Sequence, residues 1–320
     1  MIRRLKSITQ RSYRLEKKMT DEDIAPETPR VSVSEARLLA PVDRIAYARA
    51  DRWIAYPRAN RIFKKLDALL NHPPTHRTPC LAVIGRSNNG KTMLLREFER
   101  RRAPRSRPLR ESARVPVLYL QAPSHADRRE LYDGLLRSLK VPCRYSESAG
   151  RKLSILLHVM SEVQVKMVVI DEFHQATALQ RRQATMFMDS IKHLSNELAI
   201  PIVIAGTEAA ALILKSEAQF SSRFEVEHLP VWKMDSEFAR LLLTLGEQLP
   251  LIEKAELATP QIAPLLHSMS EGYIGDLWAL LRRATIAAIE DGSEKITPTL
   301  LRKLDWTSPS QRKSALNKIL

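Results

Sequence analysis

The sequence contains little cysteine, and this scarcity excludes one common class of metal site. Only Cys80 and Cys143 occur in 320 residues, and they lie far apart. They lack the paired spacing that a cysteine-based zinc site requires. We therefore expect two buried or idle thiols in a protein of the reducing cytoplasm.

Long apolar runs are also missing. The longest apolar segments are short and strand-like, and none has the length that spans a bilayer. Arg3, Arg4 and Lys6 open the chain, but neither an apolar stretch nor a small-residue cleavage site follows them. This pattern argues against a secretory signal. The sequence also lacks internal repeats and long low-complexity tracts, and we expect a cytoplasmic protein without a membrane partner.

Basic residues are in clear excess. Lys and Arg number 51 against 36 Asp and Glu, which gives a formal net charge of +15. Such a surplus repels itself and favours a polyanionic partner, with nucleic acid ahead of an anionic membrane surface. The excess is concentrated in residues 1–20 and in residues 96–114, where eight arginines occur with three glutamates. Taken alone, each cluster is also compatible with a role in solubility.

The chain divides into four parts. Residues 1–41 are polar and charged and predict a basic, flexible extension. Residues 42–230 continue from two helical patterns into alternating strands and helices, which predicts an α/β core. Residues 231–307 show only helical patterns and predict a smaller helical unit. Residues 308–320 form a basic tail that we expect to be loosely held.

Five strand-like segments predict a parallel sheet with helices on both faces. The first four are near-continuous apolar runs, as expected of strands buried on both faces, and the fifth alternates like an edge strand. The predicted strands are 80–84, 115–120, 165–170, 200–205 and 224–229. The helical patterns between and after them cover 93–102, 128–139, 153–162, 180–197, 209–216, 236–249, 262–269, 274–289 and 298–304.

Residues 85–92 match the phosphate-binding loop G-x-x-x-x-G-K-[ST]. The backbone N–H groups of such a loop curl around phosphate oxygens, which requires residues that tolerate unusual dihedral angles. Lys91 is expected to reach the β and γ phosphates, and Thr92 to offer its hydroxyl to magnesium. The predicted nucleotide-binding residues are Gly85, Arg86, Ser87, Asn88, Asn89, Gly90, Lys91 and Thr92, with ATP and Mg²⁺ as cofactors.

Further candidate catalytic residues stand at the ends of later strands. Asp171 and Glu172 follow an apolar strand, where Asp171 would hold magnesium and Glu172 would polarise the attacking water; such a pair also caps helices. Thr207 follows the next strand and could help to position the water, although hydroxyls at strand ends are common. Arg223 precedes the last strand and could reach the γ phosphate of a neighbouring subunit, or cap a helix.

With these motifs in order, the chain resembles the AAA+ ATPases of DNA transposition, specifically the TniB family and its relative TnsC. The resemblance covers nearly the whole chain from about Val42, and its more specific motifs are residues 55–59, 85–92, 168–174, 204–207 and 272–278. It implies a five-stranded AAA+ core with a helical lid that binds ATP. It also implies oligomeric rings or filaments on double-stranded DNA, which bridge the target to a DDE transposase, with a TniQ-type adaptor that commonly selects the target.

The predicted lid departs from the AAA+ pattern in one respect. Many AAA+ lids carry an arginine that senses the γ phosphate in the segment equivalent to residues 272–277, and this segment has none. Arg282 or Arg283 could substitute, or could be solvated helix residues. ATP-dependent closure of the lid is therefore a weaker expectation than ATP binding.

A few neighbouring side chains have two interpretations. His174 follows the two carboxylates closely enough to touch the site, but the interpretation that we favour is an ordinary loop residue. Trp53 and Tyr56 precede the core and either flank the adenine or pack in the interior.

The candidate DNA contacts follow the first two strands of the core. Arg100, Arg101 and Arg102 end the helix after the phosphate loop, and Ser124, Arg128 and Arg129 follow the next strand. With the usual AAA+ strand order, both connections face the pore of a ring, where arginines can track DNA phosphates with little sequence preference. The alternative is that these arginines stabilise solvated helix ends.

Related functions stay open. A helicase loader or the helper ATPase of an insertion-sequence transposase would show a similar arrangement in residues 50–230. A third hypothesis is an ATP-dependent DNA scaffold that hydrolyses ATP very slowly. We expect a slow ATPase that DNA stimulates.

Overall fold

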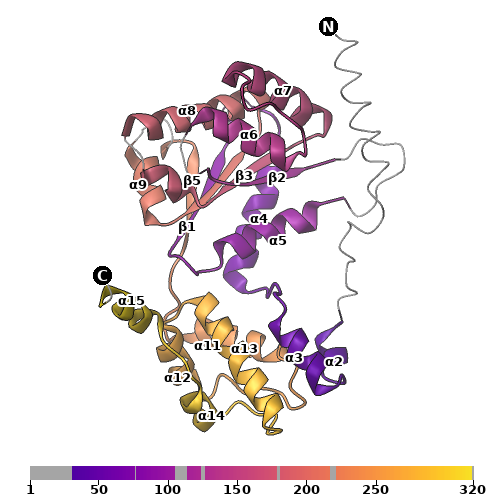
Figure 1. The fold of residues 1–320 in the computed structure, drawn as a ribbon, viewed down its shortest axis with the longest axis vertical. Helices are drawn as coiled ribbons and strands as arrows, with labels where there is room; N and C mark the ends of the chain where they lie inside the picture. The colour runs from indigo at the N-terminus through magenta and orange to yellow at the C-terminus, as the bar shows by residue number, and fades with distance from the viewer. Residues whose placement is uncertain are drawn as a thin grey trace.

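The structure is a computed structural model that describes residues 31–75, 77–104, 114–123, 127–178, 181–216 and 221–318. Figure 1 shows an α/β unit in its upper half and a helical unit in its lower half. Within the described parts of the chain, no helix has both the length and the apolar character needed to cross a membrane.

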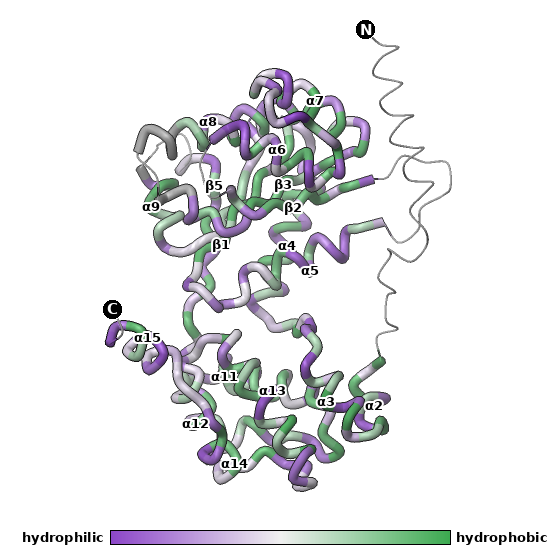
Figure 2. The backbone as a smooth tube through the Cα atoms, in the orientation of Figure 1, coloured by the Kyte–Doolittle hydropathy of each residue, from purple (hydrophilic) through white to green (hydrophobic). Residues whose placement is uncertain are grey.

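The α/β unit is built on a five-stranded parallel sheet. The strands are β1 (Cys80–Gly85), β2 (Val117–Gln121), β3 (Met167–Asp171), β4 (Ile202–Gly206) and β5 (Phe224–Leu229), in the order β2-β3-β4-β1-β5. The prediction of a five-stranded parallel sheet is confirmed, with β5 at one edge. Most residues of β1, β3 and β4 are apolar, and all of them are buried. Because the strands are parallel, their carboxyl ends meet at one edge of the sheet, where the polar residues that follow them can gather. Figure 2 shows the apolar strands within the unit.

Helices cover both faces of the sheet. Side chains that alternate along β1 enter two different apolar clusters, with Leu81 and Val83 in one and Ala82 and Ile84 in the other. The first cluster includes residues of α4 (Pro57–Leu70) and α5 (Lys91–Arg102). The second includes residues of α6 (Arg128–Ser138), α7 (Ala149–Glu162), α8 (Arg181–Leu198) and α9 (Glu208–Ser216).

The helical unit forms a lid that shares a core with the α/β unit. Its helices are α11 (Ser236–Glu247), α12 (Ala263–Ser270), α13 (Ile274–Glu290) and α14 (Pro298–Lys303). Leu277 of the lid and Val83 of the sheet belong to one apolar cluster, together with Tyr56 and Trp232 at the junction. This continuous core fixes the start of α13 against the loop that follows β1.

The N-terminal helices pack on the lid. These helices are α2 (Val33–Ala36) and α3 (Pro41–Arg49). Arg44 is buried and forms an ion pair of 2.6 Å with Glu294, and Arg37 donates to the carbonyl oxygens of Glu247 and Leu249. The sequence assigned residues 31–41 to a flexible extension and α3 to the ATPase core, whereas both helices contact the helical unit.

The residues after Ser308 form a helix, α15 (Pro309–Asn317), where the sequence predicted a loosely held tail. Ser308 and Gln311 make a reciprocal capping box at its start, which satisfies free backbone donors of the first turn. The helix is attached to the lid by Arg312, which pairs with Asp276, and by the Ser310 N–H, which donates to Glu271.

Candidate nucleotide site

The loop between β1 and α5 has the backbone that a phosphate cradle requires. Gly90 has a φ of 82° and Asn88 a φ of 59°, in the left-handed region that glycine and asparagine tolerate best. A side chain at Gly85 would place its Cβ 2.7 Å from the Leu229 carbonyl oxygen, because β5 lies directly beside β1 there. Asn89 is buried and donates to the carbonyl oxygens of Leu229 (2.6 Å) and Pro230 (3.0 Å). The loop is therefore clamped to the end of β5.

Lys91 begins α5 and turns back into this loop. Its side chain is buried, and Nζ donates to the carbonyl oxygens of Gly85 and Arg86, both at 2.8 Å. Burial lowers the pKa of the Lys91 ammonium, while the nearby Glu172 and Asp171 carboxylates oppose the shift. The loop thus encloses the Lys91 ammonium, beside backbone N–H groups of the kind that bind phosphate oxygens.

Thr92 and Asp171 meet at the carboxyl edge of the sheet. The Thr92 hydroxyl donates to Asp171 Oδ2 at 2.6 Å, although the two residues lie on α5 and β3. Asp171 is fully buried, and its Oδ1 accepts from the Glu172 N–H at 2.7 Å. A hydroxyl and a carboxylate side by side are the hard oxygen ligands that Mg²⁺ prefers. The structure therefore brings the two predicted magnesium residues together.

Tyr119 is a member of this site that the sequence did not reveal. Its hydroxyl donates to Asp171 Oδ2 at 2.6 Å, and its ring lies under the Arg96 guanidinium, 3.4 Å from the ring centroid. Burial raises the pKa of the Tyr119 hydroxyl, and the Asp171 carboxylate adds to the shift. The only available signal was a phenol inside an otherwise apolar strand. Tyr119 therefore helps to fix the orientation of the Asp171 carboxylate.

The donor set fits magnesium held in part by phosphate. Among the described residues, no three His, Cys, Asp or Glu side chains gather as a metal site. Mg²⁺ is usually bound by one or two protein groups together with water and substrate phosphates, so Thr92 and Asp171 suffice for a nucleotide-dependent site.

Glu172 leaves β3 with a φ of 53° and points toward a histidine. His174, at the start of the short helix η2 (Phe173–Ala178), places Nε2 3.3 Å from Glu172 Oε2. Both side chains are partly exposed, at 29% for His174 and 32% for Glu172. His174 is therefore a neighbour of the carboxylate, whereas the sequence favoured an ordinary loop residue.

The lid closes directly on the phosphate loop. The Asn88 side-chain amide donates to Asp276 Oδ2 at 2.7 Å, and the Gly275 N–H donates to the Asn88 carbonyl oxygen at 3.1 Å. Arg86 donates to the Tyr273 hydroxyl at 3.0 Å. Each of these lid residues belongs to the segment 272–278, whose contacts the sequence alone did not show. The remaining loop residue, Ser87, is exposed.

Thr207 and Arg223 lie at the expected strand ends. Thr207 directly follows β4, and its carbonyl oxygen accepts from the Ala210 N–H at 2.9 Å. Arg223 directly precedes β5, and its guanidinium donates to Asn196 Oδ1 at 2.7 Å. The side chain of Arg223 thus engages α8 of its own chain, and its role toward a neighbouring subunit stays a prediction.

Two arginines considered as substitutes for a lid arginine make their contacts elsewhere. Arg282 forms an ion pair of 3.0 Å with Asp51, and Arg283 donates to the Asp305 carbonyl oxygen at 2.7 Å. In this conformation neither contact involves the phosphate loop.

The two aromatic residues ahead of α4 pack against the apolar core, with Tyr56 buried and Trp53 partly buried. The Trp53 ring stacks on Phe63 with centroids 5.3 Å apart, and Tyr56 meets Trp232 edge-on at 5.5 Å. Burial raises the pKa of Tyr56 to about 12. The Tyr56 hydroxyl also lies 3.9 Å from where a Cβ of Gly90 would be. Tyr56 therefore packs in the core and also lies close to the phosphate loop at Gly90.

The candidate DNA residues differ in their contacts. Arg100 and Arg101 form ion pairs with Glu97, and Arg102 pairs with Asp67. Arg128 and Arg129 are exposed in the first turn of α6. Ser124 and the cluster in residues 1–20 lie outside the described residues.

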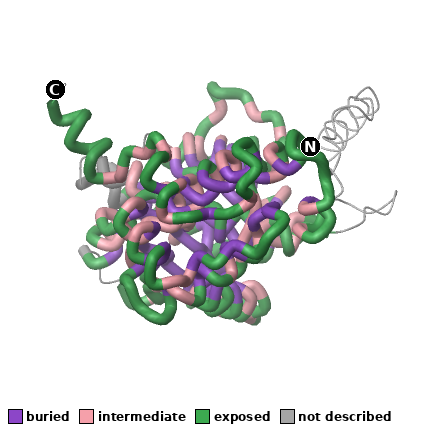
Figure 3. Tube along the Cα trace, turned by 90° about the horizontal axis from the view of Figure 1, so that it is seen from below, coloured by how far each residue is buried: buried purple, intermediate pink, exposed green. Residues whose placement is uncertain are grey.

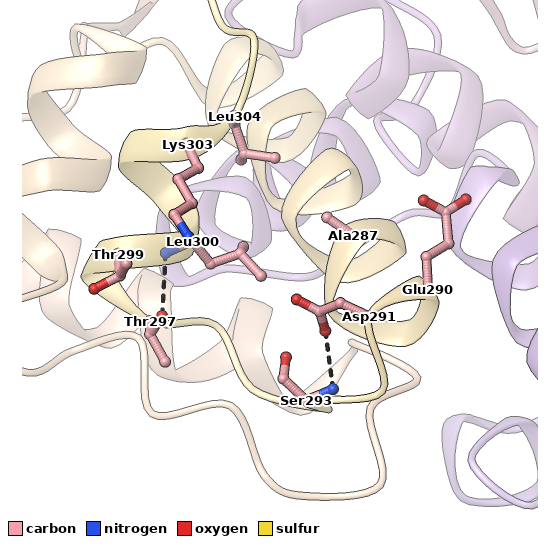
Figure 4. A pocket seen from close by; sticks show the side chains of 9 residues that line it. All are labelled: Ala287, Glu290, Asp291, Ser293, Thr297, Thr299, Leu300, Lys303 and Leu304. Carbon is pink, nitrogen blue, oxygen red and sulfur yellow. Dashed lines mark hydrogen bonds between the residues drawn. The ribbon is translucent and has the colours of Figure 1, made fainter.

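A separate hollow of about 510 Å³ lies at the far end of the lid (Figure 4). It is formed by the end of α13 and by α14, whereas the phosphate loop contacts the start of α13. Its charged lining residues, Glu290, Asp291 and Lys303, are all exposed. The hollow is therefore distinct from the candidate nucleotide site.

Solved structures share this fold at low sequence identity. The Aeropyrum pernix ORC2 protein in its ADPNP-ADP complexes is 18% identical with a TM-score of 0.58, and the match covers 80% of this chain and 70% of that chain. Cdc6p from Pyrobaculum aerophilum is 17% identical with a TM-score of 0.57 over 81% of this chain and 69% of that chain. The Aeropyrum pernix ORC1 protein in complex with DNA is 16% identical with a TM-score of 0.58, over 85% and 69%. These likenesses confirm an AAA+ fold.

The sequence itself matches one protein family over most of the core. No match is found among curated proteins. The family model described as "Bacterial TniB protein" matches residues 44–234, which contain the phosphate loop, both carboxylates and all five strands. The match covers more than half of the chain, so the protein belongs to the bacterial TniB family.

Proposed function

We propose that this protein is an ATP-binding and ATP-hydrolysing AAA+ regulator of DNA transposition. It assembles as an oligomer on double-stranded target DNA and links that DNA to a DDE transposase and a TniQ-type adaptor. The observation that carries the nucleotide part is the 2.6 Å contact between Thr92 and Asp171 at the mouth of the phosphate loop. Membership of the bacterial TniB family supports the proposed role in DNA transposition.

The residues of the site divide the work of hydrolysis. Lys91 and the loop N–H groups bind the phosphates, and Thr92 and Asp171 hold Mg²⁺. When bound, Mg²⁺ supplies charge neutralisation to the β and γ phosphates. Glu172 orients and polarises the attacking water, and Thr207 helps to position it. Tyr119 keeps the Asp171 carboxylate in place through its hydrogen bond.

One contact favours slow turnover. In this conformation Glu172 faces His174 at 3.3 Å, and a carboxylate that is engaged by a neighbour is less available to water. A slow scaffold that holds ATP on DNA is therefore the second candidate function. Steady-state ATP hydrolysis by the purified full-length protein, measured with and without duplex DNA, tests both. Stimulation by DNA supports the regulator, and a rate at background under both conditions supports the scaffold.

Replacing Arg223 tests whether neighbouring subunits share one ATP site. The Arg223→Ala variant is expected to retain nucleotide affinity within about twofold but to lose hydrolysis roughly 100-fold, because the arginine would act on a neighbour's γ phosphate. Mixing it with a Lys91→Ala variant is expected to restore part of the activity, since one variant supplies the site and the other the arginine. The matched control is Arg61→Ala, which removes an exposed arginine on α4. Failure of mixing to restore activity in co-assembled protein contradicts the shared site.

Arg128 and Arg129 are expected to contact the DNA backbone. Replacing both by alanine should weaken binding to two unrelated duplexes equally. It should also reduce the slope of log affinity against log salt concentration by about two, because two phosphate contacts are lost. Replacing Arg100, Arg101 and Arg102 should have a smaller effect, since their ion pairs with Glu97 and Asp67 compete with phosphate. A salt series of affinities provides the measurement, with Arg137→Ala in the last turn of α6 as the control. Unchanged affinity and salt slope in both variants would show that DNA binds to another surface.

A further inference from the structure

The C-terminal helix α15 is attached to the lid beside the phosphate loop by polar contacts. None of its residues is buried, and it projects from the body of the molecule (Figure 3). Arg312 forms an ion pair with Asp276, and the Ser310 N–H donates to Glu271 Oε1 at 2.9 Å. The position of α15 therefore depends mainly on lid carboxylates, and the Arg312 guanidinium also lies 5.8 Å from the centroid of the Trp306 ring.

Asp276 connects this helix to the phosphate loop. Its side chain is 5% exposed, with Oδ1 facing Arg312 and Oδ2 accepting from the Asn88 amide at 2.7 Å. The neighbouring Gly275 packs so closely that an added Cβ would lie 2.0 Å from Asn88 Oδ1. Asn88, Asp276 and Arg312 thus form a continuous chain of side-chain contacts from the loop to the C-terminal helix.

The charge of Asp276 presents an electrostatic problem for a nucleotide site. A buried carboxylate beside a loop that receives a polyphosphate repels that ligand, and the repulsion is strong where water is excluded. The Asn88 amide is neutral and cannot cancel the charge. Arg312 supplies the compensating cation, and it comes from the end of the chain.

We propose that Arg312 is a positioning residue of the nucleotide site, which neutralises Asp276 and holds it against Asn88, so that nucleotide binding and docking of α15 favour each other. The proposal rests on the proposed nucleotide binding and adds to it a contribution from the C-terminal helix. Because binding couplings are reciprocal, a docked α15 raises nucleotide affinity by the same factor by which nucleotide stabilises the docked helix.

The test measures the affinity of the full-length protein for a fluorescent ATP analogue with Mg²⁺. Arg312→Ala should weaken binding on the order of tenfold, because it leaves a buried charge unpaired. Arg312→Lys should restore part of the loss. The matched control is Lys313→Ala, which removes the exposed neighbouring cation on the same helix and should bind like wild type.

A double-mutant cycle separates this role from a simple structural one. Asp276→Asn keeps an acceptor for Asn88 but removes the charge, so Arg312→Ala in that background should change affinity by less than about twofold. Equal losses in both backgrounds, or wild-type affinity of Arg312→Ala, would overturn the proposal. A wild-type protein that binds no nucleotide would instead overturn the proposed function on which it rests.

Proteolysis supplies a second readout that does not depend on hydrolysis. Nucleotide with Mg²⁺ should slow tryptic cleavage after Lys313, a site that both proteins keep, severalfold in the wild type, because the docked helix is a poor substrate. The protection should disappear in Arg312→Ala. Protection that is equal in the two proteins contradicts the coupling, and thermal unfolding of each variant verifies that it is folded.

Discussion

Lys91→Ala is expected to abolish ATP binding, with an affinity loss of about 100-fold or more. The Lys91 ammonium is buried at the centre of the loop and donates to the carbonyl oxygens of Gly85 and Arg86. The loop motif predicts that this ammonium binds the β and γ phosphates. The other loop cation, Arg86, is exposed and turned toward Tyr273. Isothermal titration with ATP and Mg²⁺ measures the effect.

The control for Lys91 is a lysine with the same charge in a different setting. Lys64 is exposed on α4, so Lys64→Ala removes one positive charge without touching the loop and should leave affinity unchanged. Thermal unfolding should show that Lys91→Ala is folded. Wild-type affinity of a folded Lys91→Ala protein contradicts the assignment of the phosphate loop.

Glu172→Gln is expected to separate binding from turnover. Glutamine keeps the size and polarity of the side chain but cannot act as a base, so hydrolysis should fall by roughly 100-fold to 10,000-fold while ATP affinity changes little. Since the ATP-bound form then persists, DNA-bound assemblies should accumulate. Phosphate release and sedimentation with duplex DNA measure the two effects.

The comparison for Glu172 uses an exposed acid outside the site. Glu162 ends α7, and Glu162→Gln makes the same chemical change outside the site and should hydrolyse ATP like wild type. A normal rate in Glu172→Gln shows that Glu172 does not activate the water. Such a result would not make Asp171 the base, because its carboxylate already accepts hydrogen bonds from Thr92 and Tyr119.

Local sequence patterns predicted the strands and the loop well, because both depend on short-range chemistry. The predicted segment 224–229 coincides with β5, and the other four strands begin or end within two residues of the prediction. The glycines and asparagines of residues 85–92 tolerate the left-handed backbone observed at Asn88 and Gly90. Strand burial and backbone tolerance are properties of a few consecutive residues, so a single sequence can reveal them.

Contacts between distant segments were not predictable in the same way. Nothing near Tyr119 in the sequence indicates that its hydroxyl binds Asp171, since only the β2–β3 pairing brings them together. Likewise, the tail after Ser308 has few apolar residues, which suggests a loose segment. It is held by an ion pair with Asp276, a carboxylate that lies 36 positions from Arg312, and by the hydrogen bond from the Ser310 N–H to Glu271.

The sequence by itself determined the phosphate loop, the carboxylates at the end of β3 and the parallel α/β architecture. Each of these follows from the conformational and chemical properties of adjacent residues. Only the tertiary structure decided which side chains share the site: Tyr119 on Asp171, His174 beside Glu172, and Asp276 between Asn88 and Arg312. The physical reason is that these contacts depend on how helices and strands pack, and packing is set by the whole apolar core that joins sheet and lid.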